Sequence, residues 1–173
     1  MRWMVAAVVA IGLCGPASAA MTITSADFKD GDALPPAHVF TRCGGQNVSP
    51  QLSWTDNGAA QSYVLTMIDV SVKPSYWSHW LIADLPRFST ALPRGVTKLP
   101  PPAIGLGSDF GGVTYNGPCP PPGSGTHRYE FTIWAMPLPS TTLPAPSSAK
   151  GVTEILMKTS LDHATIAATV TAK

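Results

Sequence analysis

The chain has 173 residues, of which 45% are hydrophobic and 12% charged, and its 11 Lys and Arg nearly balance its 10 Asp and Glu. Because the Lys and Arg residues form no cluster, neither nucleic acid nor an anionic membrane surface is expected as a partner held by bulk charge. The length allows one sizeable core, and neither a linker nor an internal repeat divides the chain, so we expect a single domain.

The first twenty residues are typical of a cleavable export signal. Arg2 provides the positive end, residues 4–13 form the apolar core, and Ala-Ser-Ala at 17–19 matches the small-residue cleavage pattern. The apolar run is too short to span a bilayer, which takes roughly 20 residues, and no later run approaches that length. We therefore expect a signal peptide over residues 1–20, a periplasmic or secreted domain over residues 21–173, and no integral membrane segment.

Apolar residues alternate with polar ones, or form short unbroken runs, in several segments that we predict as strands. These segments are residues 51–54, 63–69, 76–86, 129–136 and 166–171. In the third of them, alternation places Trp77 and His79 on one face and Trp80 and Ile82 on the other. A long region at 88–112 is rich in proline and glycine and is predicted to be mostly loop.

Only one helix is predicted, over residues 153–164, where apolar side chains fall on or near one face. Thr153 or Ser148 would cap its N-terminus, and His163 would lie at its end. Since strands do not alternate with helices, a parallel α/β sheet is disfavoured. We predict a mainly β fold, an antiparallel β-sandwich with one or two short helices near the C-terminus.

Two cysteines, Cys43 and Cys119, remain once the expected signal peptide is removed. An even number of cysteines in an oxidising compartment indicates a disulfide. Such a bond would close a loop of about 77 residues, which is long enough to stabilise the fold considerably. The alternative is a pair of buried free thiols.

The segment 115–129, YNGPCPPPGSGTHRY, is the most distinctive of the chain. Its prolines and glycines exclude a helix or a central strand, so we predict a stiff, tightly turned loop that leads into the strand at 129–136. Such a loop would hold His127 and Tyr129 in fixed positions at the rim of a pocket. The alternative is a plain proline-rich connection at the surface.

His79 and His127 each lie beside aromatic residues in a rigid setting, and Asp69 ends the strand that precedes His79. The other two histidines, His38 and His163, are expected to be a loop residue and a helix-terminal residue. Two imidazoles and a carboxylate can bind an anion, ligate a metal, or form a buried polar network without any ligand. The sequence contains no motif of a serine hydrolase, a zinc protease or a nucleotide-binding loop, so these three possibilities stay open.

Five segments together resemble the phosphatidylethanolamine-binding proteins, and most closely their bacterial branch, which is often labelled Raf-kinase-inhibitor-like. They are GPCPPPGSGTHRY at 117–129, CGGQNVSPQLSW at 43–54, the strand that ends in Asp69, WSHW at 77–80 and SDFG at 108–111. Their order and spacing agree over about residues 22–171, nearly the whole of the expected mature chain.

The resemblance implies a β-sandwich with a small anion-binding cavity. The residues that it places around the cavity are Asp69, His79, Gly117, Pro118, Pro120, Pro121, His127 and Tyr129. The chain departs from the family at 69–74, where it reads Asp-Val-Ser-Val-Lys-Pro and the family usually reads Asp-Pro-Asp-Ala-Pro. This departure bears on the shape of one wall and on the head groups that it accepts.

From the residues and the resemblance we expect an exported binding protein for a small phosphorylated or carboxylated ligand, such as a phospholipid head group. We expect no enzymatic activity, no cofactor and no bound metal. The hydrogen-bond donors would be His79, His127, backbone N–H groups near Gly117 and the Tyr129 hydroxyl. Two alternatives remain: an inhibitor that docks on a protease or kinase through its surface loops, and a metal-dependent hydrolase built on Asp69 and the same two histidines.

Overall fold

The computed structural model describes residues 20–173 with the exception of residues 57, 142 and 144–147. The expected signal peptide, residues 1–20, thus lies outside the described residues apart from Ala20. Along the described chain the elements are β1 (Thr22–Thr24), η1 (Pro36–His38), η2 (Thr41–Cys43), β2 (Leu52–Thr55), β3 (Ser62–Asp69), β4 (Trp77–Pro86), β5 (Ala91–Leu92), β6 (Ile104–Leu106), β7 (Thr126–Met136), α1 (Ala149–Thr159) and β8 (Asp162–Thr171), where η marks a 3-10 helix.

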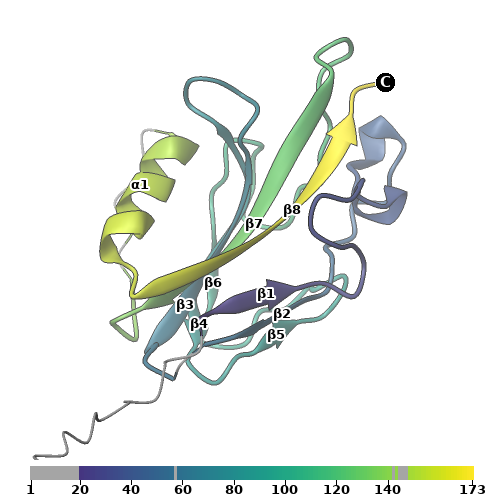
Figure 1. The fold of residues 1–173 in the computed structure, drawn as a ribbon. Coiled ribbons are helices and arrows are strands. Elements are labelled where there is room, and N and C mark those ends of the chain that lie inside the picture. The colour runs from purple at the N-terminus through teal and green to yellow at the C-terminus, as the bar shows by residue number, and fades with distance from the viewer. Residues whose placement is uncertain (1–19, 57, 142, 144–147) are drawn as a thin grey trace, which may run out of the picture.

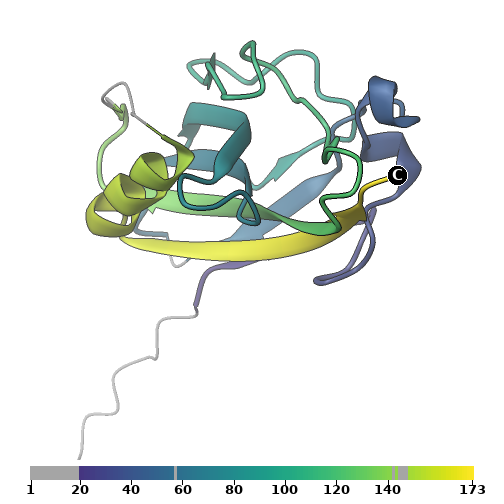
Figure 2. The ribbon, with the colours of Figure 1, turned by 90° about the horizontal axis from the view of Figure 1, so that it is seen from above.

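The strands form two antiparallel sheets, which confirms the predicted mainly β architecture (Figure 1). One sheet has three strands in the order β1-β2-β5, and the other has five in the order β6-β4-β3-β7-β8. The main core joins apolar side chains of both sheets, and α1 packs on the opposite face of the larger sheet (Figure 2). No helix in the described part of the chain is long and apolar enough to cross a membrane.

β3 runs through the middle of the larger sheet and is buried along its whole length. Leu65 and Met67 point into the main core, whereas Val64 packs with Leu156 beneath α1. Because both faces of β3 are covered, its sequence is a nearly continuous apolar run rather than an alternating one. This strand ends at Asp69, so the Asp69 carboxylate lies at the edge of the main core.

The predicted helix, residues 153–164, is wrong at both ends, because α1 spans Ala149–Thr159. Ser148, one of the two predicted caps, accepts a hydrogen bond from the Gly151 N–H at 3.1 Å and starts the helix earlier than expected. Gly151 lies in this first turn, and a glycine in a helix costs about 1 kcal/mol relative to alanine. The sequence therefore did not indicate that the helix begins here.

The residues after α1 enter β8, so His163 lies on a strand and not at the end of a helix. Its ring stacks on Trp134, with the ring centroids 4.9 Å apart. Ten residue pairs join β7 to β8, and their backbone hydrogen bonds favour the strand over a longer helix.

The region 88–112, predicted to be mostly loop, contains the two short strands β5 and β6. β5 pairs with β2 and β6 pairs with β4. Strands of two or three residues are too short to display an alternating pattern, so only their neighbours in the sheet define them. The rest of this region includes residues 107–112, which reach the candidate site.

Candidate functional site

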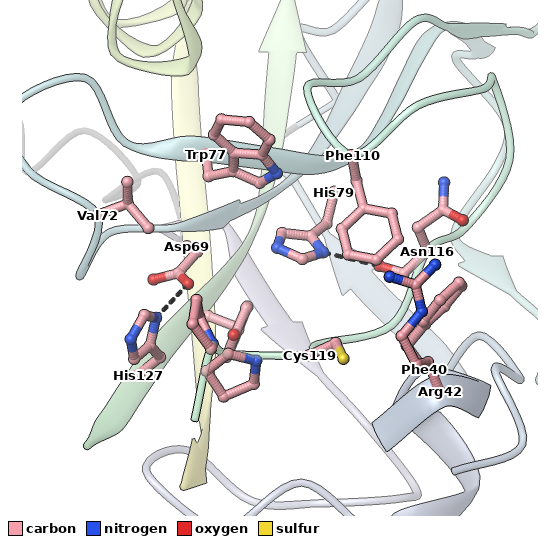
Figure 3. A pocket seen from close by; sticks show the side chains of 13 residues that line it. Phe40, Arg42, Asp69, Val72, Trp77, His79, Phe110, Asn116, Cys119 and His127 are labelled. Atoms are coloured by element: carbon pink, nitrogen blue, oxygen red, sulfur yellow. Dashed lines mark hydrogen bonds and ion pairs between the residues drawn. The ribbon is translucent and has the colours of Figure 1, made fainter. Parts of the chain in front are cut away.

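A pocket of about 660 Å³ opens where β3 ends and β7 begins (Figure 3). Asp69 and Tyr129 are direct cross-strand partners there, and alternation places His127 on the same face of the sheet. The pocket therefore continues the main core toward the solvent. Its lining residues are Phe40, Arg42, Asp69, Val72, Trp77, His79, Phe110, Asn116, Cys119, Pro120, Pro121, His127 and Tyr129.

A β-bulge brings β4 into the pocket. The register of β4 against β3 shifts at His79, which is left as an extra residue without a partner on β3. The shift also changes the alternation, because Trp77 becomes the partner of Asp69 and comes to the same face as Trp80. The predicted opposite placement of these two tryptophans is therefore wrong, and both His79 and Trp77 line the pocket.

His79 is a buried and neutral imidazole. Its side chain is only 3% exposed, and its Nδ1 lies 3.0 Å from the carbonyl oxygen of Asn116. Because a carbonyl can only accept, Nδ1 carries the hydrogen and Nε2 is left with a free lone pair. Burial lowers the pKa of His79 to about 4, although the Asn116 carbonyl and the carboxylates of Asp69 and Asp109 act in the opposite direction. At neutral pH His79 thus offers an acceptor rather than the expected charged donor.

Asp69 and His127 form the second polar group of the pocket. The His127 Nδ1 lies 2.6 Å from one carboxylate oxygen of Asp69, and the backbone N–H of Ser71 donates to the other at 2.9 Å. This arrangement leaves Nε2 as the ring nitrogen with which His127 can meet a ligand. Burial and the neighbouring Asp69 carboxylate raise the pKa of Tyr129, so its hydroxyl stays protonated.

Cys43 and Cys119 are joined in a disulfide, as predicted. The bond connects η2 to the proline-rich loop, so the loop that carries Pro120 and Pro121 is tied to the segment that carries Phe40. These residues line the pocket from two sides, and the disulfide thereby fixes one wall to another.

Gly117 lets the proline-rich loop lie against the segment 38–40. A Cβ atom at this position would meet the backbone of that segment at under 3.0 Å, which no real side chain tolerates. The Gly117 N–H donates to Asn47 Oδ1 at 2.7 Å, and the Phe40 N–H donates to the Pro118 carbonyl at 3.0 Å. Gly117 and Pro118 therefore shape the wall from behind, and the Gly117 N–H is not available to an anion.

Phe110 closes the pocket on the side of His79. Ser78 donates from its N–H and from its hydroxyl to one oxygen of Asp109, at 2.8 and 2.7 Å, and accepts from the Asp109 N–H at 2.9 Å. The next residue, Phe110, is thereby held with its ring centroid 4.9 Å from His79 and 4.8 Å from Phe40. This packing keeps water from His79 and explains its burial.

Six of the eight residues expected around the cavity line the pocket. They are Asp69, His79, Pro120, Pro121, His127 and Tyr129. Whether they bind a ligand stays a prediction. Sequence reasoning missed Phe40, Arg42, Val72, Trp77, Phe110 and Asn116 as lining residues. Trp77, Phe110 and Asn116 stand inside or beside the motifs that the resemblance used. Arg42 directly precedes the motif at 43–54, but nothing in the sequence singled it out.

Another residue that sequence reasoning treated too simply is His38. It ends η1 rather than lying in a loop, it is 1% exposed, and its Nδ1 lies 2.7 Å from the Val48 carbonyl. Its Nε2 faces the carboxylate of Asp27 at 3.6 Å. His38 does not line the pocket. Its contacts with Val48 and Asp27 instead hold the segment that carries Phe40 and Arg42.

Residues 20–173, without the undescribed positions, contain no group of three or more His, Cys, Asp and Glu side chains placed to hold a metal ion. Asp69, His79 and His127 therefore do not form the two-histidine, one-carboxylate set that their composition allowed.

Comparisons with known proteins give one consistent result. The sequence profile described as phosphatidylethanolamine-binding protein matches residues 24–171. A UPF0098 protein of Aquifex aeolicus is 38% identical over 137 residues, which cover 78% of each chain. The UPF0098 protein YbcL of Escherichia coli is 36% identical over 143 residues, which cover 78% of this chain and 77% of YbcL.

Solved structures and a mycobacterial relative extend the comparison. The crystal structure of YbcL, described as a new member of the mammalian PEBP family, superimposes with a TM-score of 0.79 and covers 90% of this chain and 100% of the other, at 32% identity. A protein named putative lipoprotein LppC, from Mycobacterium tuberculosis, is 34% identical over 137 residues, which cover 79% of this chain and 64% of LppC.

Proposed function

Because this chain belongs to the phosphatidylethanolamine-binding protein family, we propose that its pocket binds a small phosphorylated or carboxylated ligand and performs no chemistry on it. The observation that carries the proposal is the buried pair of Asp69 and His127 at the floor of a preformed pocket of about 660 Å³. Pockets of this size with few, well-placed polar groups are typical of small-molecule sites.

The pair offers complementary contacts to a head group. With Nδ1 facing Asp69, a charged His127 imidazole can donate from Nε2 to a phosphate or carboxylate in a charge-assisted hydrogen bond. The Asp69 carboxylate can in turn meet the amine of a zwitterionic ligand. Apolar side chains, including Phe110 and the buried Pro120, line the pocket beside these groups, and the less polar surroundings strengthen both contacts.

Binding without chemistry is supported by the kind of side chains in the pocket. The lining residues include no serine, threonine or lysine, and the lining cysteine, Cys119, is held in the disulfide. A free hydroxyl of Ser or Thr, a free thiol and a lysine amine, which are common nucleophiles, are thus absent from the lining. Asp69 is engaged by His127 and by the Ser71 N–H, which favours a positioning role for the carboxylate.

Export of the mature chain, to the periplasm or beyond the cell, is part of the same proposal. The first twenty residues have the pattern of a signal peptide. A disulfide between Cys43 and Cys119 suits an oxidising compartment. The relative named putative lipoprotein is consistent with this placement, since lipoproteins are exported.

Calorimetric titration with phosphorylethanolamine and with a simple phosphomonoester tests the proposal. Replacing His127 by alanine is expected to weaken binding roughly ten- to a hundred-fold, the effect of losing one charge-assisted hydrogen bond. His163→Ala is the matched control, because this exposed histidine stacks on Trp134 away from the pocket and should bind like the native chain. Equal loss in both variants, or no binding by the native chain, would contradict the proposed site.

A further inference from the structure

The charges that line the pocket are unevenly distributed. Asp69 is hydrogen-bonded to His127 at 2.6 Å, and burial keeps the pKa of His79 well below physiological pH. Arg42 is therefore the one permanently positive side chain among the lining residues. Since the whole chain is close to neutral, the permanent positive field at this pocket comes from Arg42 at close range.

Arg42 also has no competing partner. Within the described residues its guanidinium makes neither an ion pair nor a hydrogen bond, whereas Arg94 pairs with Asp27 and Arg128 pairs with Glu130. Figure 3 shows the Arg42 side chain reaching from η2 to the Phe110 and Asn116 side of the pocket, away from Asp69 and His127. Its five N–H donors are thus free to bind a carboxylate or phosphate bidentately.

The position of Arg42 is fixed by its neighbours in the chain. The next residue, Cys43, is bonded to Cys119, and Phe40 packs edge-on against Phe110 with centroids 4.8 Å apart. An arginine on such an anchored segment loses less freedom on binding than one on a mobile loop. Between Arg42 and the Asp69–His127 pair the pocket wall is largely aromatic and proline-rich.

From this arrangement we propose that Arg42 is a second anion-recognising residue of the pocket, in addition to His127, and that it selects an anionic group carried on an apolar or aromatic body. The proposal rests on the proposed binding function and specifies its ligand. Arg42 contacts the anion from the rim of the pocket, and the apolar body lies along Phe110 and Trp77. A pocket of about 660 Å³ has room for such a body, whereas inorganic phosphate alone would leave the aromatic wall uncovered.

Phenyl phosphate and inorganic phosphate are the probes that test this inference, in calorimetric titrations of the disulfide-bonded chain. Phenyl phosphate is expected to bind roughly tenfold or more tightly than inorganic phosphate, because its ring buries apolar surface. Arg42→Ala should weaken the binding of both probes roughly ten- to a hundred-fold. Arg42→Lys should recover part of this loss, because lysine keeps the positive charge but lacks the planar guanidinium that donates two parallel hydrogen bonds. Phe110→Ala should weaken phenyl phosphate more than inorganic phosphate.

Arg87→Ala is the matched control. Arg87 is exposed, follows the far end of β4 and does not line the pocket, yet its loss lowers the net charge by the same amount. Equal weakening by Arg42→Ala and Arg87→Ala would overturn the proposal in favour of a general field effect. Native affinity in Arg42→Ala, together with a loss in His127→Ala, would overturn the role of Arg42 and leave the proposed function standing. Absence of binding by the native chain would overturn both.

Discussion

Replacing Cys43 and Cys119 together by serine is expected to lower the free energy of unfolding by about 4 kcal/mol. The two cysteines are 76 residues apart, so the bond restricts a large part of the unfolded chain and removes much of its conformational entropy. Urea denaturation of the native protein and of the double variant, both without reductant, measures the difference. A loss of this size is a large fraction of the stability of a typical domain.

The same protein under reducing conditions is the control for this prediction. Native chain with its disulfide reduced should unfold at the same urea concentration as the Cys43→Ser, Cys119→Ser variant, whereas reductant should leave the variant unchanged. Titration of thiols in denatured, unreduced mature protein should find none reactive. Two reactive thiols per mature chain, or matching denaturation midpoints for oxidised native and variant protein, would contradict the prediction.

The fold could be predicted from the sequence where strands are long and buried. β3 and β7 have eight and eleven residues, enough for apolar runs to stand out between turn residues. β5 and β6 could not be found, because two or three residues carry no pattern and only pairing with β2 and β4 defines them. The bounds of α1 were missed because Gly151 lies in its first turn and because pairing with β7 draws His163 into β8.

The site was predicted where chemistry-bearing residues stand at the ends of recognisable strands. Asp69 ends β3, and His127 and Tyr129 begin β7, so pairing of these strands brings the three together. The surroundings of His79 could not be read from the sequence, because they depend on a β-bulge and on the packing of Phe110 from a distant loop. Arg42 was missed because an exposed arginine in a short 3-10 helix such as η2 gives no local signal.

The state of His79 is the part of the site that differs most from the sequence expectation, and it predicts how stability depends on pH. Burial lowers the pKa of His79 from 6.5 to about 4 in the folded protein. As the pH falls below 6.5 the unfolded chain therefore takes up a proton at this residue before the folded chain does. The contribution of His79 to the free energy of unfolding is fully present above about pH 6.5 and is lost as the pH falls from 6.5 toward 4. Below about pH 4 this residue causes no further loss of stability.

Replacing His79 by asparagine should remove this decline, because the Asn side chain can still donate to the Asn116 carbonyl but does not titrate. Between pH 7 and pH 4 the stability of the native chain relative to His79→Asn should fall by about 3 kcal/mol, the value of a shift of this size. Urea denaturation at a series of pH values measures the difference. His163→Asn is the control, since this histidine is exposed and its replacement should leave the native decline in place. Parallel stability curves for the native chain and His79→Asn would show that His79 is accessible to solvent in the folded state, and the pocket would then lack the closed aromatic wall that Phe110 provides.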